Sequence, residues 1–150
     1  MLNSLANLLF MSKTIVQKII FKKASVAILY NLYMNSRQHA AATQADANIS
    51  PIEGGRYSAH DKYITGNNLR LVKNKLIVQS WRASNWGKDI ADSIFIIALE
   101  QKGNDVIVVA THANVPDDEF DDLKKGWKEF YWEPWKKYLA GPGRTRSSKS

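Results

Sequence analysis

Cysteine is absent from this chain of 150 residues, which excludes disulfides, cysteine-ligated metals and thiolate nucleophiles. Its three histidines, His39, His60 and His112, lack the spacing of a metal-binding motif. Phosphate-binding loops, dinucleotide fingerprints and the G-x-S-x-G motif are also missing. We therefore expect no cofactor, no metal and no enzymatic activity. The strongest candidate for an acid or base is His112, with Asp61 a distant second.

Long hydrophobic runs are lacking as well. The apolar start MLNSLANLLFMSK is too short to cross a bilayer and has neither the basic segment nor the cleavage site of a signal peptide. We expect residues 1–12 to be a disordered extension, with Met11 as an alternative start. No membrane span is predicted, and the absence of cysteine suits a reducing compartment, so we expect a cytoplasmic protein.

Basic residues exceed acidic ones, 21 to 14, but not in a pattern that nucleic acids require. Three of them, Arg144, Arg146 and Lys149, lie in the terminal GPGRTRSSKS, and residues 141–150 are expected to form a disordered tail. Without these three charges, the net charge of +7 falls to +4. No basic run alternates with aromatic residues, so we predict no nucleic-acid partner and a basic surface that maintains solubility.

Residues 13–140 show the signals of one domain. Ser25 is a plausible cap for a helix over 26–34, and Ser36 for a second short helix ending at Ala42. Strands are predicted over residues 13–22, 47–49, 55–61, 63–72, 76–82, 92–101 and 105–113. The turn sequences at 53–55, 73–75 and 102–104 make the connections short, which implies an antiparallel meander.

The segment from Val115 to Leu139 is predicted to be a single long helix. Pro116 and the acidic residues after it are typical of a helix start, and Gly141-Pro142 of a stop. About 22 helical residues span roughly 33 Å, enough to cross a whole sheet. Pro134 inside the helix predicts a kink, because proline removes one backbone hydrogen bond.

One face of this helix is strongly apolar. The stripe at helical spacing comprises Phe120, Leu123, Trp127, Phe130, Tyr131 and Pro134. These side chains are expected either to form core or to roof a cavity. Trp132 and Trp135 fall off the stripe, so they either pack against the first two helices or mark a partner surface.

The strand over 76–82 has two distinguishable faces. One face carries Ile77, Gln79 and Trp81, and the other carries Val78, Ser80 and Arg82. An unpaired arginine is costly to bury, so the Trp81 face is expected to point inward. The strand over 92–101 is apolar on both faces, and alternation alone does not orient it.

Several motifs in sequence order carry a family resemblance. They are IEGGRYS at 52–58, TG at 65–66, KLIVQSWRASNW at 75–86, THANVP at 111–116 and GWKEFYWEPWKKYL at 126–139. Together they resemble the activator of heat-shock-protein-90 ATPase homologue family, within the START-like (SRPBCC) superfamily, over residues 13–140. The resemblance implies an α+β helix-grip fold: a curved antiparallel sheet wrapped around the long C-terminal helix, with two short helices after the first strand. In eukaryotic members this domain is one half of a longer cochaperone, which makes a chaperone of the heat-shock-protein-90 class a candidate partner in a stress response.

The same resemblance implies a cavity between sheet and helix. Combined with strand alternation and the helical stripe, it predicts a lining of Tyr57, Ile77, Gln79, Trp81, Phe95, Ile97, Leu99, Val108, Ala110, His112, Leu123, Trp127, Phe130, Tyr131 and Pro134. Gln79 and His112 must bond either neighbouring side chains or water, or else the polar end of a ligand. We therefore predict a domain that binds a small hydrophobic or amphipathic ligand. The alternative is a protein-interaction module related to the cochaperone, and a cyclase-like enzyme is less favoured.

Overall fold

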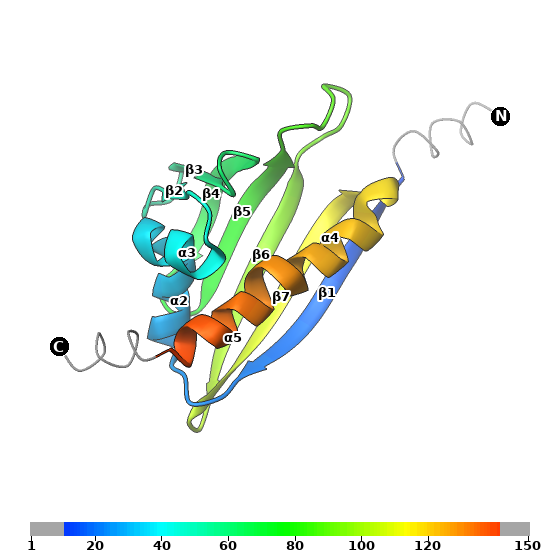
Figure 1. The fold of residues 1–150 in the computed structure, drawn as a ribbon. Helices are drawn as coiled ribbons and strands as arrows, with labels where there is room; N and C mark the ends of the chain where they lie inside the picture. The colour runs from blue at the N-terminus through cyan, green and yellow to red at the C-terminus, as the bar shows by residue number, and fades with distance from the viewer. Residues whose placement is uncertain (1–10, 142–150) are drawn as a thin grey trace.

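The strands of the computed structural model, which describes residues 11–141, join in one antiparallel sheet of order β1-β7-β6-β5-β4-β3-β2 (Figure 1). Their bounds are β1 Ser12–Phe21, β2 Asn48–Ile49, β3 Arg56–Ala59, β4 Ile64–Val72, β5 Leu76–Ala83, β6 Ser93–Lys102 and β7 Asp105–Pro116. Consecutive strands from β2 to β7 are neighbours in the sheet. The first strand, β1, pairs with the last, β7. The predicted meander is confirmed. The disordered extensions were predicted over 1–12 and 141–150. Residues 1–10 and 142–150 lie outside the described residues, and Ser12 already belongs to β1 and pairs with Pro116.

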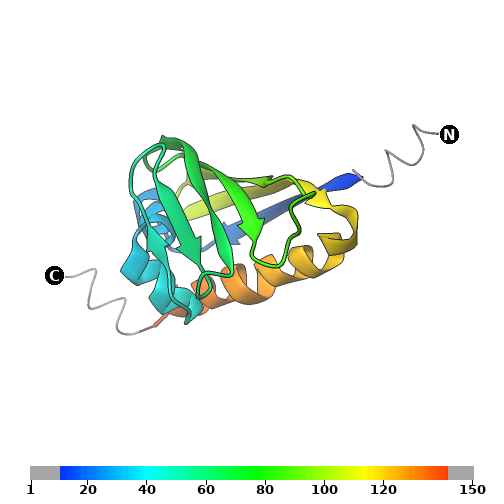
Figure 2. The same cartoon turned by 90° about the horizontal axis from the view of Figure 1, so that it is seen from above.

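The helices lie on one face of this sheet (Figure 2). Two short ones, α2 Val26–Met34 and α3 Ser36–Thr43, follow β1. The long C-terminal helix consists of a 3-10 turn η1 Asp117–Glu119, then α4 Phe120–Trp127, a π-helical turn η2 Lys128–Trp132 and α5 Glu133–Leu139. The sheet curves over this helix, so the predicted α+β helix-grip fold is confirmed. No helix among residues 11–141 is long and apolar enough to cross a membrane.

Two hairpin turns show why the meander could be predicted locally. Asn74 and Gly103 have φ of 63° and 59°, the left-handed conformation that asparagine and glycine tolerate best. They occupy the predicted turns between β4 and β5 and between β6 and β7. Because both connections are tight, β4 pairs with β5 and β6 pairs with β7.

The start of the long helix differs from its prediction. The helix was predicted to begin at Pro116, and β7 to end at Ala113, but Pro116 is the last residue of β7 and pairs with Ser12. Its φ of −53° and ψ of 137° are extended. Proline tolerates a strand end as well as a helix start, because neither position needs its missing donor. The first helical turn therefore begins at Asp117, whose carboxylate forms an ion pair with Lys13 at 3.1 Å.

The cap of α3 is Asn35, not Ser36 as predicted. The side-chain oxygen of Asn35 accepts a hydrogen bond from the Gln38 backbone N–H at 3.0 Å. The Ser36 hydroxyl instead accepts from the Ile49 backbone N–H at 2.8 Å, which ties β2 to the start of α3. Asn35 also ends α2, since its own N–H bonds the Asn31 carbonyl. One residue thus separates the two helices.

The distortion expected at Pro134 takes the form of a wider turn. The N–H of Glu133 bonds the Lys128 carbonyl, five residues back, and Pro134 has no donor to continue the α pattern. The added residue shifts the helical phase after Trp127, although Tyr131 of the predicted stripe stays buried. Trp132 and Trp135 therefore point inward and are 3% and 0% exposed. Phe130, which was placed on the stripe, is 56% exposed and does not form core.

Gly66 of β4 offers a sharp test of the sheet packing. A Cβ added there would lie 1.9 Å from the Ser80 carbonyl oxygen and 2.8 Å from the Tyr57 ring. Gly66→Ala should therefore lower the free energy of unfolding by roughly 1–3 kcal/mol, measured by urea denaturation. The matched control is Gly87→Ala, where a Cβ meets nothing within 4 Å and no change is expected. Equal denaturation midpoints for the two variants would contradict this close approach of β4 and β5.

Candidate functional site

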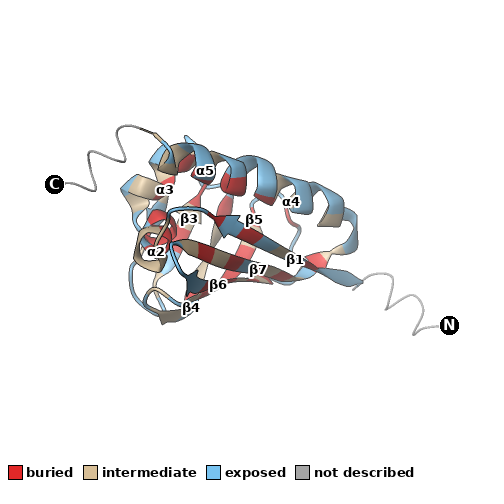
Figure 3. Cartoon of the chain, turned by 90° about the horizontal axis from the view of Figure 1, so that it is seen from below, coloured by how far each residue is buried: buried red, intermediate tan, exposed pale blue. Residues whose placement is uncertain are grey.

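Buried positions on the sheet and on the long helix face one another (Figure 3), and many of the buried side chains are aromatic. The Trp127 ring stacks on Phe95 of β6, with ring centres 3.9 Å apart and planes 4° from parallel. Trp135 packs against Phe21 of β1 and Tyr33 of α2, at 6.0 and 6.1 Å between ring centres. Trp132 donates from its indole N–H to the Gln17 side-chain oxygen at 2.7 Å. Neither Trp132 nor Trp135 marks a partner surface. Trp135 packs on α2, which agrees with the predicted packing against the first helices.

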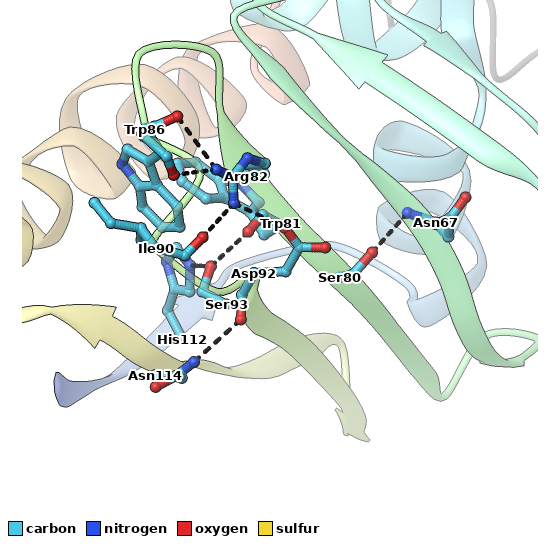
Figure 4. A network of polar contacts seen from close by, with 11 residues as sticks. Asn67, Ser80, Trp81, Arg82, Trp86, Ile90, Asp92, Ser93, His112 and Asn114 are labelled. Carbon is cyan, nitrogen blue, oxygen red and sulfur yellow. Dashed lines mark hydrogen bonds and ion pairs between the residues drawn. The ribbon is translucent and has the colours of Figure 1, made fainter. Parts of the chain in front are cut away.

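A buried chain of hydrogen bonds joins Trp127 to the sheet through His112. An indole nitrogen can only donate, so the 3.0 Å contact makes His112 Nδ1 the acceptor. The Nε2 atom then carries the proton and donates to the Ser93 hydroxyl at 2.7 Å. Ser93 in turn donates to the Trp81 carbonyl at 2.8 Å (Figure 4). Every polar side-chain atom in this series of hydrogen bonds has a partner.

These contacts define the role of His112. Burial lowers the pKa of its imidazole to about 3, so the ring is neutral at physiological pH. Both ring nitrogens are committed to Trp127 and Ser93, which makes His112 a structural link between helix and sheet. Asp61, the other candidate acid or base, lies exposed in the β3–β4 turn and accepts from the Asp46 backbone N–H. Within residues 11–141, no group of three or more metal-binding side chains occurs.

Gln79 is satisfied in the same way. The Tyr33 hydroxyl donates to its side-chain oxygen at 2.7 Å, and its amide nitrogen donates to the Asn68 side-chain oxygen at 2.9 Å. Asn68 then donates to the backbone carbonyls of Ser50 and Ile52. Gln79 and His112 both point inward, and side chains supply their partners. Asn68 was not identified from the sequence, although an asparagine beside a strand irregularity is a recognisable signal.

A third buried link, also missed in the sequence, centres on His39 of α3. Its Nδ1 donates to the Tyr33 carbonyl at 2.8 Å, so its Nε2 accepts from the Tyr131 hydroxyl at 3.0 Å. Burial lowers the pKa of His39 to about 4. The helical spacing of His39 and Ala42, both buried, was the available signal. Tyr131 is thereby fixed against α3, while Trp127 is fixed against the sheet.

An open hollow of about 490 Å³ remains at one mouth of the grip. Five predicted lining residues border this mouth cavity: Trp81, Leu123, Trp127, Phe130 and Tyr131. The other lining residues are His60, Tyr63, Ile64, Asn85, Glu119, Asp122 and Gly126. The remaining predicted residues do not border it: Tyr57, Ile77, Gln79, Phe95, Ile97, Leu99, Val108, Ala110 and His112 lie in the filled interior, and Pro134 is half-buried on α5. The structure therefore separates a packed interior from an open mouth.

The turn that borders this mouth has an unusual backbone. His60, Asp61 and Lys62 all have left-handed φ, of 50°, 56° and 72°, although none is glycine. The predicted strand over 55–61 therefore stops at Ala59. The turn places the His60 ring 5.2 Å from Tyr131 and 5.9 Å from Phe130. Burial lowers the pKa of His60, which favours the uncharged ring.

A larger hollow of about 870 Å³ lies outside the grip, beside α2, α3 and the end of α5. Its walls include Asn31, Arg37, Gln38, Tyr138 and Leu139. None of its lining residues takes part in the three buried hydrogen-bonded links. We assign no role to this hollow.

Arg82 organises the loop on the other side of the mouth cavity. Its guanidinium donates to the backbone carbonyls of Trp86, Gly87 and Ile90, and to the Asp92 carboxylate at 3.2 Å (Figure 4). The sequence placed Arg82 on the outer face of β5. In the structure its side chain is partly buried, and its guanidinium is fully paired. Its bonds close the loop between β5 and β6, which carries Asn85 at the cavity edge.

No helix of the described residues 11–141 covers the outer face of the sheet (Figure 2). Two rows of paired residues cross β1, β7, β6 and β5: Val16, Thr111, Ile96, Val78; and Lys18, Val109, Ala98, Leu76. A third row joins Ile20, Ile107 and Glu100. Val16, Ile20 and Val109 are 63%, 46% and 36% exposed. An antiparallel sheet with one solvated face usually carries polar residues there. This outer sheet face is mainly apolar.

The neutral state of His112 predicts a pH dependence. Its pKa is about 3 when folded and near 6.5 when unfolded, so its contribution is complete above pH 6.5 and is lost progressively as pH falls toward 3. His112→Gln removes this proton uptake. Between pH 6.5 and 4.5 the wild type should lose about 2 kcal/mol more unfolding free energy than the variant, measured by urea denaturation. The control His60→Gln should retain most of the wild-type slope, and identical slopes for wild type and His112→Gln would contradict the buried neutral imidazole.

Comparison with known proteins agrees with this architecture. The family described as "Activator of Hsp90 ATPase homolog 1-like protein" matches residues 23–140. An activator of 90 kDa heat shock protein ATPase homolog from Dictyostelium discoideum is 34% identical over 101 residues, 66% of this chain and 26% of that protein. The human homolog 1 is 25% identical over 105 residues, 70% of this chain and 31% of that protein. The match therefore spans about a third or less of these curated relatives.

Two solved structures share the fold. An HSP90 activator from Plasmodium falciparum superposes with a TM-score of 0.74 at 18% identity, covering 79% of this chain and 89% of that one. CalU16 from Micromonospora echinospora gives 0.73 at 16% identity, covering 92% and 82%. At these identities the likeness concerns the fold alone. The family match over most of the sequence, together with the helix-grip architecture, shows that the chain belongs to the Activator of Hsp90 ATPase homolog 1-like protein family.

Proposed function

We propose that this domain binds a chaperone of the heat-shock-protein-90 class through its outer sheet face and modulates the chaperone's ATPase. The observation that carries the proposal is the apolar character of that face across four adjacent strands. The curated relatives are described as activators of this ATPase, which supports the identity of the partner. A chaperone of this class would place the domain in the cytoplasm, the location expected from the sequence.

The composition of the outer sheet face suits a protein partner. Val109 lies at its centre, paired with Lys18 on one side and Ala98 on the other. Val16 and Ile20 extend the apolar surface to the sheet edge, with Lys18 between them on the same strand. Burying such side chains contributes roughly 25 cal/mol per Å² of apolar area before the costs of association. An apolar centre with charges beside it matches the general anatomy of protein interfaces.

A second candidate function is the binding of a small hydrophobic or amphipathic ligand. The filled interior does not favour it, since Trp127 and Phe95 occupy the centre of the grip. The mouth cavity does favour it, because about 490 Å³ falls within the range of small-molecule sites. The two candidates use different surfaces, so both can hold at once.

The proposed partner surface can be tested with charge. The double variant Val16→Glu and Val109→Glu places two carboxylates on the outer sheet face without filling any core position. We expect its affinity for a heat-shock-protein-90 homologue to fall by about tenfold or more, since desolvating carboxylates at an apolar interface is costly. Stimulation of the chaperone's ATPase should fall in parallel. Calorimetric titration and a steady-state ATPase assay measure the two effects.

The matched control is Ile52→Glu. Ile52 is 65% exposed on the connection between β2 and β3, so it receives the same change away from the face. This variant should bind and stimulate as the wild type does. Undiminished binding by the double variant would exclude the outer sheet face, and failure of the wild type to bind any such chaperone would overturn the proposed function.

A further inference from the structure

The mouth cavity has a location and size that suit a small ligand. It lies between the left-handed turn at 60–62, the end of β5 and the first half of the long helix. Its volume of about 490 Å³ exceeds what one or two aromatic rings occupy. The interior behind it is closed by Trp81, Trp127 and Tyr131, all 4% exposed or less. A ligand would therefore rest against these rings and remain open to solvent on its other side.

The formal charges that line this cavity are all negative. Glu119 and Asp122 border it, and neither lysine nor arginine does. His60 is also in the wall, but burial lowers its pKa and leaves it uncharged. The chain as a whole carries a net charge of +7. A cavity lined by two carboxylates in a basic protein selects against anions and in favour of cations.

The two carboxylates are unpaired in the described part of the chain. Glu119 and Asp122 lie three residues apart at the start of the long helix, which places them on one side of it. Neither carboxylate accepts a hydrogen bond or forms an ion pair within residues 11–141. The neighbouring cations are engaged elsewhere: Lys124 lies 5.8 Å from the Phe120 ring centre, and Lys125 pairs with Glu129. Burial and the nearby Asp118 and Asp122 raise the pKa of Glu119, so a cation there would relieve repulsion.

Aromatic side chains supply the rest of the wall. Phe130 is exposed because of the π-helical turn, and its ring stands beside His60 at the cavity edge. Tyr63 is 41% exposed on the opposite side, where its hydroxyl donates to Asn85. Such rings offer apolar surface on which the ring system of a ligand can stack. Aromatic rings beside unpaired carboxylates form a setting for an organic cation.

We infer that the mouth cavity binds an organic cation with an apolar body of one or two rings. The ammonium group lies near Glu119 and Asp122, and the apolar body lies against Trp127, Phe130 and Leu123. This inference rests on the second candidate function, ligand binding in the cavity, and adds its charge selectivity. It is independent of the outer sheet face. Neutral and anionic amphiphiles of the same size are the disfavoured ligands.

Three probes that share a naphthalene ring test the charge selectivity. They are naphthylmethyl-trimethylammonium, naphthylmethanol and naphthylacetate, and binding is followed through the amide resonances of Tyr63, Leu123 and Phe130. We expect the cation to bind about tenfold more tightly than the neutral probe at low salt, and the anion most weakly. Phe130→Ala should weaken both the cation and the neutral probe.

The double variant Glu119→Gln and Asp122→Asn isolates the carboxylates. It should bring the cation to the affinity of the neutral probe and leave the neutral probe unchanged. The matched control Asp118→Asn and Asp121→Asn removes two acids that do not line the cavity and should keep the preference. Equal affinities of cation and neutral probe for the wild type, or a preference that survives in the first double variant, would overturn the charge selectivity alone. Absence of binding by all three probes would overturn the ligand site as well.

Discussion

The contact on which the rest of the structure depends is the packing of Trp127 against the sheet. Its ring stacks on Phe95 and its N–H donates to His112, so one side chain secures the long helix by apolar burial and by a directed hydrogen bond. The apolar contact sets how closely the helix approaches, and the hydrogen bond sets its rotation. Everything C-terminal to Trp127 is arranged from that point: Tyr131 reaches His39, and Trp135 reaches Tyr33.

The packing of Trp127 also affects where the domain can bind other molecules. A helix-grip fold can keep the space under its helix empty, but here indole and phenyl rings occupy it, backed by neutral histidines whose nitrogens are all used. The proposed binding sites are two of the surfaces that this packing leaves open, the outer sheet face and the mouth cavity. The first is broad and apolar, which suits a macromolecule. The second is small, aromatic and acidic, which suits a compact ligand.

Sequence reasoning, helped by the family resemblance, predicted the sheet and helices because their signals are local. Asn74 and Gly103 mark turns by their own conformational tolerance, and the inward orientation of Gln79 and His112 follows from alternation. It failed where a residue suits two structures or where distant elements decide. Pro116 fits a strand end and a helix start equally. The hydrogen-bond partners Tyr33, Asn68 and Ser93 come from other elements, and no glycine announced the left-handed turn at His60.

The π-helical turn between α4 and α5 divides the long helix into two segments. The positions that face the sheet follow a different helical phase in each segment. Up to Trp127 the inward positions follow ordinary helical spacing, and beyond it Tyr131, Trp132 and Trp135 are all buried, so two adjacent residues of the turn face inward. In an alignment, this turn behaves as a one-residue insertion inside an unbroken helix. In an uninterrupted α-helix, Phe130 would lie on the same stripe as Leu123 and Trp127. The exposed ring at the cavity edge is thus a by-product of helical phase.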